Sequence, residues 1–173
     1  MIQPVSFFTV LSVLLFLYAA WSDFRSWKIP NAAVLALIGL YAVNAAVALG
    51  TADDVGAALF SFAGIGGDVG AGLLLFALGF VLWLFGLFGA GDAKLFLPIG
   101  LFVGWLGMLP FAIFLLIGGV FTMLALKLPM PLQFAHYAFV MRLQEIRTSR
   151  KIPYGVIMVF AALAAMALRP NGI

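Results

Sequence analysis

Apolar residues occur along the chain in long runs with few polar interruptions, and this pattern predicts helices that cross a membrane. A helix needs roughly 20 apolar residues to cross a bilayer core about 30 Å thick. Six runs approach that length, so we expect about six transmembrane helices. They cover approximately residues 5–21, 32–49, 69–88, 95–108, 110–128 and 154–168. Residues 57–65 are apolar but too few to span alone, so they form either an interfacial piece or the start of a long third helix.

Composition strengthens this interpretation and excludes several classes of protein. The 173 residues are 66% hydrophobic and 9% charged, whereas a soluble domain is about 45–50% apolar and about 25% charged. A net charge of +3 is too sparse for a nucleic-acid-binding surface, and the absence of Cys excludes disulfides, thiolate metal sites and cysteine nucleophiles. We expect an all-α polytopic membrane protein, a single domain over residues 1–173, with no metal or other cofactor.

The positive charges predict which way the chain crosses the membrane. Arg25 and Lys28 lie between the first two runs, and Lys94 lies between the third and fourth. Five more cations lie at or between the last two runs: Lys127, Arg142, Arg147, Arg150 and Lys151. These connections alternate onto one side, which the positive-inside rule makes cytoplasmic. Both termini are then outside, and Arg169 is the one cation on that side.

The longest polar segment, residues 130–152, falls on the cytoplasmic side in this topology. Its apolar residues recur near helical spacing, with charged residues between them. This pattern predicts a short helix along the cytoplasmic interface. No basic residue precedes the first apolar run, so we expect that helix to be retained rather than removed as a signal peptide.

Four of the six acidic residues have simple explanations. Asp53 and Asp54 lie in an outer connection, and Glu145 lies on the polar side of the expected interfacial helix, so all three are expected to be solvated. Asp68 follows two glycines just before the third run, where we expect it to cap a helix at the outer interface.

Asp23 and Asp92 are different, because both lie at cytoplasmic helix ends in this topology. An ionisable group at a membrane boundary is costly unless it is solvated or paired, which makes a functional role the first hypothesis. The alternative is that each is a helix-end charge paired locally, Asp23 with Arg25 and Asp92 with Lys94. The Gly-Ala-Gly sequence at residues 89–91 lets another backbone approach the Asp92 carboxylate closely.

Three segments of the chain resemble sequences of a known protein family. Asp-Phe-Arg-Ser-Trp-Lys-Ile-Pro-Asn at residues 23–31 resembles the first block of type IV prepilin peptidases. Gly-Ala-Gly-Asp-Ala-Lys-Leu at residues 89–95 resembles their second block, the signature of GxGD intramembrane aspartyl proteases. Ile-Pro-Tyr-Gly at residues 152–155 is similar to their C-terminal block. The resemblance implies that Asp23 and Asp92 are the catalytic pair.

The resemblance also implies a reaction and a partner. Gly89, Gly91 and Lys94 belong to the active-site motif, where Lys94 either holds the charge of the pair or extends to lipid headgroups. The implied substrate is a prepilin, whose basic leader we expect to be cleaved at the cytoplasmic face of the bacterial cytoplasmic membrane. Larger members carry a cysteine-paired insertion and methylate the mature pilin. This chain lacks Cys and resembles the short Flp-type members, so we expect no N-methyltransferase activity.

Two other functions remain open from the sequence. A small proton- or ion-coupled transporter would use the same acids to relay cations, but it favours acids near the middle of the membrane. A non-catalytic scaffold of a secretion machine would use them in helix packing. The sequence leaves the pilin, the oligomeric state and the division of roles between the two aspartates undetermined.

Overall fold

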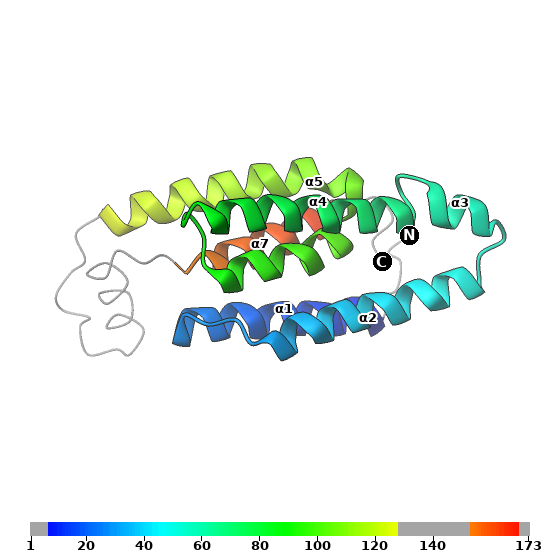
Figure 1. Ribbon diagram of the computed structural model, residues 1–173, viewed down its shortest axis with the longest axis horizontal. Helices are drawn as coiled ribbons and strands as arrows, with labels where there is room; N and C mark the ends of the chain where they lie inside the picture. The colour runs from blue at the N-terminus through cyan, green and yellow to red at the C-terminus, as the bar shows by residue number, and fades with distance from the viewer. Residues whose placement is uncertain (1–6, 128–152, 170–173) are drawn as a thin grey trace.

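The structure, a computed structural model, describes residues 7–127 and 153–169, where helices are joined by short connections and no strand is present. Its helices are drawn in Figure 1: α1 (Phe7–Ser26), α2 (Asn31–Gly50), α3 (Val55–Phe60), α4 (Ile65–Leu84), α5 (Ala90–Lys127) and α7 (Tyr154–Ala167). The interfacial helix expected at residues 130–152 lies outside the described residues.

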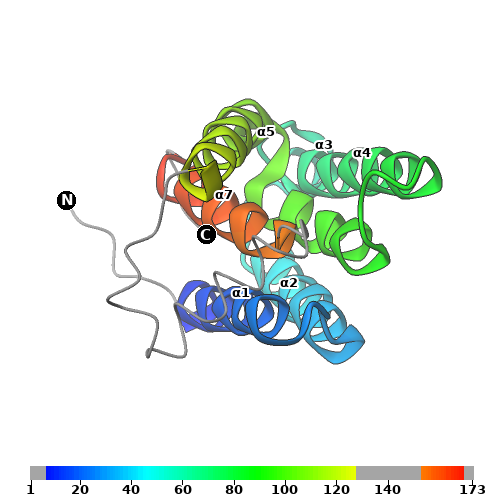
Figure 2. The ribbon, with the colours of Figure 1, turned by 90° about the vertical axis from the view of Figure 1, so that its left-hand side faces the viewer.

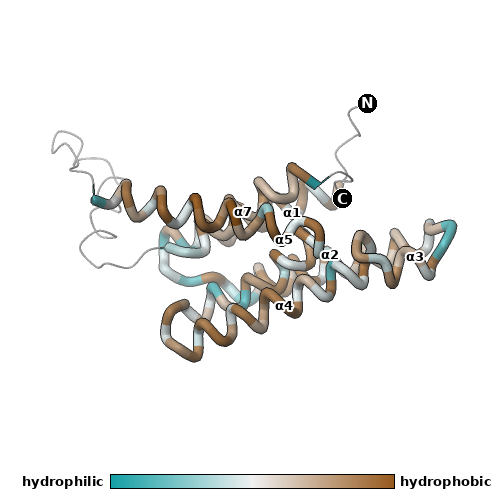
Figure 3. Tube along the Cα trace, turned by 90° about the horizontal axis from the view of Figure 1, so that it is seen from above, coloured by the Kyte–Doolittle hydropathy of each residue, from teal (hydrophilic) through white to brown (hydrophobic). Residues whose placement is uncertain are grey.

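Helix length and composition confirm the polytopic membrane class. Among the residues that the structure describes, four stretches are long and apolar enough to cross a bilayer, and α7 is a shorter apolar helix. Large apolar side chains cover the outward faces of these helices, as lipid contact requires. Hydrophilic segments lie mostly at helix ends and in connections (Figure 3).

Helix α5 contains the sharpest feature of the fold, a reversal at Gly104. This glycine adopts φ 68° and ψ 174°, which divides α5 into a first arm (residues 90–103) and a second arm (residues 105–127). Phe96 and Phe111 would lie about 22 Å apart along a straight helix, yet their ring centroids are 6.3 Å apart. The two arms therefore run in opposite directions, as Figure 1 shows. The sequence predicted two helices here but was wrong to place their junction at Leu109 and Pro110.

Other predicted boundaries also shift, for local reasons. Residues 55–60 form a separate helix, α3, rather than the start of α4. Helix α4 ends at Leu84 instead of near residue 88, because Gly86 takes a left-handed conformation with φ 71°. The N–H groups of Gly86 and Leu87 bond back to the carbonyls of Trp83 and Leu82, which is the Schellman pattern of helix termination.

Small residues let α4 approach the first arm of α5 closely. A β-carbon at Gly79 would lie 2.5 Å from the Phe96 ring, and one at Gly100 would lie 2.5 Å from the Gly72 Cα. Close backbone approach of this kind is how membrane helices gain van der Waals contact without a hydrophobic driving force. Helix α7 packs deep in the bundle and contributes buried residues such as Met158 and Ala162.

The connections between the helices lie at two opposite ends of the bundle. The α1–α2 and α4–α5 connections and the start of α7 lie at the left end in Figure 1, whereas α3 and the end of α7 lie at the right. Figure 2 views the molecule from that left end. Three segments far apart in sequence are therefore neighbours there, and these are the segments that carry the motif residues.

Candidate active site

Asp23 lies in the last turn of α1 and is 6% exposed. The helix ends three residues later, where the Trp27 N–H bonds to the Asp23 carbonyl at 2.9 Å. Trp27 adopts φ 56°, a left-handed conformation usually taken by glycine in this type of helix ending. The Ser22 hydroxyl donates to the Lys28 carbonyl at 2.8 Å and ties the connection back to α1. Asp23 therefore sits on a short, constrained corner.

Asp92 lies in the first turn of α5, which begins at Ala90 rather than near residue 95 as the sequence predicted. Its Oδ2 accepts the Gly89 N–H at 3.3 Å, which satisfies a backbone donor at the helix start in the manner of a capping box. The partial positive charge of a helix N-terminus also suits a carboxylate. Asp92 is partly buried, so a face of it remains accessible.

The structure brings Asp23 and Asp92 together with Gly155 of α7. The two carboxyl groups are close enough to interact electrostatically, and the Gly155 amide also faces Asp92. A β-carbon at position 155 would lie 2.8 Å from Asp23 Oδ2, so only glycine leaves room for that carboxyl group. Residues from α1, α5 and α7 thus form one cluster.

Ile29 fills the space behind this cluster and is 8% exposed. A β-carbon at Gly91 would lie 3.5 Å from Ile29 Cβ and 3.6 Å from its backbone nitrogen, so the α1–α2 connection runs directly past the second motif. A β-carbon at Gly155 would lie 3.0 Å from Ile29 Cδ1. Sequence reasoning did not select Ile29 or Gly155 as site residues. Ile29 and Gly155 lie in the segments, residues 23–31 and 152–155, that resemble the first and C-terminal blocks of type IV prepilin peptidases.

Lys94 points away from Asp92. Residues two apart in a helix do not face each other, and the Lys94 ammonium instead donates to Asn31 Oδ1 at 3.1 Å. This bond joins the N-terminus of α5 to the N-terminus of α2. The local ion pair between Asp92 and Lys94 that the sequence allowed is therefore replaced by a link between the two motif segments.

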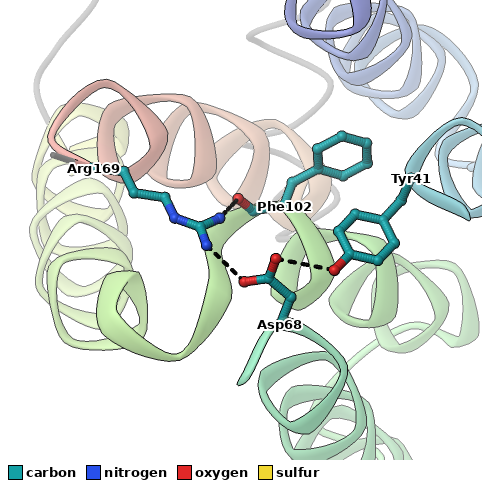
Figure 4. Close-up of polar contacts among 4 residues, drawn as sticks. All are labelled: Tyr41, Asp68, Phe102 and Arg169. Atoms are coloured by element: carbon teal, nitrogen blue, oxygen red, sulfur yellow. Dashed lines mark hydrogen bonds and ion pairs between the residues drawn. The ribbon is translucent and has the colours of Figure 1, made fainter. Parts of the chain in front are cut away.

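A second polar cluster lies at the opposite end of the bundle, around Asp68 (Figure 4). Asp68 Oδ1 pairs with Arg169 Nη2 at 2.8 Å, Asp68 Oδ2 accepts the Tyr41 hydroxyl at 2.9 Å, and Arg169 Nη1 donates to the Phe102 carbonyl at 3.2 Å. The prediction that Asp68 caps a helix was wrong, because Gly64 occupies that position and Asp68 turns inward to a buried ion pair. A β-carbon at Gly104 would collide with this pair, so the α5 reversal is built against it.

Within the described ranges, no group of three or more metal-ligating side chains could hold an ion. The Asp23–Asp92 cluster offers two carboxyl groups, backbone amides and apolar packing. Two adjacent carboxyl groups do not both ionise without cost, so they tend to share one proton. Such a pair can act as a general acid and a general base on one substrate.

Comparison with known proteins identifies one family. A model of the type IV leader peptidase family matches residues 10–128, which is over two thirds of the chain and includes both Asp23 and Asp92. No curated protein and no solved structure gives a significant match.

Proposed function

The chain belongs to the type IV leader peptidase family, and we propose that Asp23 and Asp92 together cleave the basic leader from a type IV prepilin. The observation that carries this proposal is that both carboxyl groups lie beside Gly155 at one end of the bundle, close enough to interact electrostatically. They come from different helices, 69 positions apart in the sequence, and lie on the two segments that resemble the family's motifs. We propose that the whole chain acts as one membrane-embedded peptidase domain.

The proposed reaction is hydrolysis by an aspartic acid–base pair. The ionised carboxylate takes a proton from water, and the water oxygen attacks the scissile carbonyl carbon. The protonated carboxyl group donates to the carbonyl oxygen and stabilises the charge that develops there. On collapse of the tetrahedral intermediate the C–N bond breaks, the proton on its oxygen returns to the second carboxylate, and the departing amine takes the proton that the first carboxylate removed from water. No step needs a metal ion or a covalent enzyme intermediate.

Substrate and location follow from the same proposal. The three motif segments lie at the end of the bundle that holds the α1–α2 and α4–α5 connections. Arg25, Lys28 and Lys94 lie at this end, which the positive-inside rule assigns to the cytoplasm. A basic leader ahead of an apolar helix would stay on that side and present its junction to the pair. We propose an Flp-like prepilin as the substrate and the bacterial cytoplasmic membrane as the location.

Co-expression with a candidate prepilin tests the proposal. We expect wild-type protein to convert the prepilin to a faster-migrating form on a gel, and Asp23→Asn or Asp92→Asn to leave it unprocessed at normal membrane levels. Asp53→Asn is the matched control, because Asp53 is an exposed aspartate at the other end of the bundle. Undiminished processing by either active-site variant would refute the assignment.

A further inference from the structure

The hydrogen bond from Lys94 to Asn31 is the feature of the site that the proposed reaction does not use. It joins residues 63 positions apart, at the first residue of α2 and in the second turn of α5. We propose that Asn31 and Lys94 are positioning residues, whose bond holds the α1–α2 connection against the start of α5 and so fixes Asp23 relative to Asp92. This inference rests on the proposed function, because it concerns the geometry of that pair.

The α1–α2 connection needs such a tether because its backbone is strained. Trp27 takes φ 56°, and a bulky residue in that region is disfavoured unless its surroundings hold it there. The Ser22 bond to the Lys28 carbonyl holds the connection on the α1 side. The Asn31 bond to Lys94 supplies the side-chain tether on the α5 side.

Ile29 couples the position of the α1–α2 connection to the positions of the two aspartates. It lies two residues before Asn31, and its Cβ would lie 3.5 Å from a β-carbon at Gly91, the residue immediately before Asp92. Its Cδ1 would lie 3.0 Å from a β-carbon at Gly155. The absence of a side chain at Gly155 also leaves room for the Asp23 carboxyl group. Movement of the connection away from α5 would loosen Ile29 from both glycines. The two carboxyl groups would then be free to separate.

Two other roles for Lys94 make different predictions. If its positive charge acted directly on the substrate or on the pair, removing Asn31 would have little effect. If it only extended to lipid headgroups, removing either side chain would leave cleavage unchanged. If the two residues act by positioning, cleavage requires both side chains. A substitution that keeps the hydrogen bond should then leave most of the cleavage activity.

Steady-state kinetics of the purified full-length protein in lipid nanodiscs, with a prepilin substrate, separates these roles. We expect Asn31→Ala and Lys94→Met each to lower kcat by about tenfold, the value of one hydrogen bond, with KM nearly unchanged. The double variant should be no slower than the slower single variant, because both changes remove the same bond. Asn31→Asp should restore most of kcat, since a carboxylate oxygen still accepts from Lys94.

Lys28→Met is the matched control, because it removes an exposed cation from the same connection without touching the bond. Wild-type kcat in Asn31→Ala would overturn the inference, as would additive losses in the double variant or an increase in KM without a change in kcat. A wild-type protein that fails to cleave the prepilin would instead refute the proposed function. Wild-type cleavage that Asp23→Asn abolishes keeps the proposed function intact whatever the Asn31 and Lys94 variants show.

Discussion

The Asp68–Arg169 pair gives the most quantitative stability prediction of the structure. Asp68→Asn keeps the shape of the side chain but removes its charge. It leaves the Arg169 guanidinium, with about a tenth of its side chain exposed, without a counter-ion. Arg169 also donates to the Phe102 carbonyl at the end of the first α5 arm, where helical carbonyls lack partners. The substitution should therefore weaken the contacts among α2, α4, α5 and α7 that meet at this cluster.

The magnitude follows from the two kinds of contact. Breaking a buried ion pair costs about 3–5 kcal/mol in soluble proteins, whereas polar contacts between membrane helices average about 0.6 kcal/mol because the unfolded chain also finds partners. We expect Asp68→Asn to lower the free energy of unfolding by about 2–3 kcal/mol, between these limits. Tyr41→Phe removes one hydrogen bond to a charged acceptor and should cost about 1–2 kcal/mol.

Steric trapping in detergent micelles measures these free energies of unfolding. Asp53→Asn, an exposed aspartate, is the control and should change the value by less than about 0.5 kcal/mol. Asp68→Asn combined with Arg169→Met should be less destabilising than Asp68→Asn alone, because no buried cation is left over. A loss in Asp68→Asn no larger than that in the control, or a larger loss in Tyr41→Phe, would refute the reasoning.

Three further predictions follow from the site and the topology. Gly155→Ala should abolish most prepilin cleavage, because its β-carbon would meet the Asp23 carboxyl group. Gly39→Ala, with open space around its Cα, should cleave at the wild-type rate; equal rates for the two variants would contradict the packing. Reporter fusions within residues 130–152 should report the cytoplasm, and fusions beside Asp53 the outside; the reverse pattern would place the aspartate pair on the wrong side for the leader. Mass spectrometry of the mature pilin should show an unmethylated N-terminus when this protein is the only processing enzyme present, and a methylated one would show a second activity.

Features of the fold that depend on residues close together in the sequence could be predicted from the sequence. The length of each apolar run is set by bilayer thickness, so the membrane class and most helices followed directly. The reversal at Gly104 did not, because it lies inside a long apolar stretch rich in glycine and its left-handed conformation depends on packing against Asp68 and Arg169. The junction was instead assigned to Pro110, a stronger local signal that α5 accommodates within its second arm.

Parts of the site could not be predicted from the sequence because they depend on contacts between residues that are far apart in the chain. Topology could place Asp23 and Asp92 on the same side, but their approach requires the packing of α1, α5 and α7. The role of Lys94 was open for the same reason, since its partner Asn31 is 63 residues away. Asp68 was misassigned because Arg169 lies 101 residues further along the chain.

The most direct test of the central claim is the single-turnover cleavage rate of a prepilin by purified protein in nanodiscs, compared among Asp23→Asn, Asp92→Asn and the double variant. Two carboxyl groups that act as one unit predict that each single substitution lowers the rate by about a thousandfold or more, and that the double variant is no slower than either. A single variant that retains a tenth of the wild-type rate, or losses that multiply in the double variant, would contradict the account.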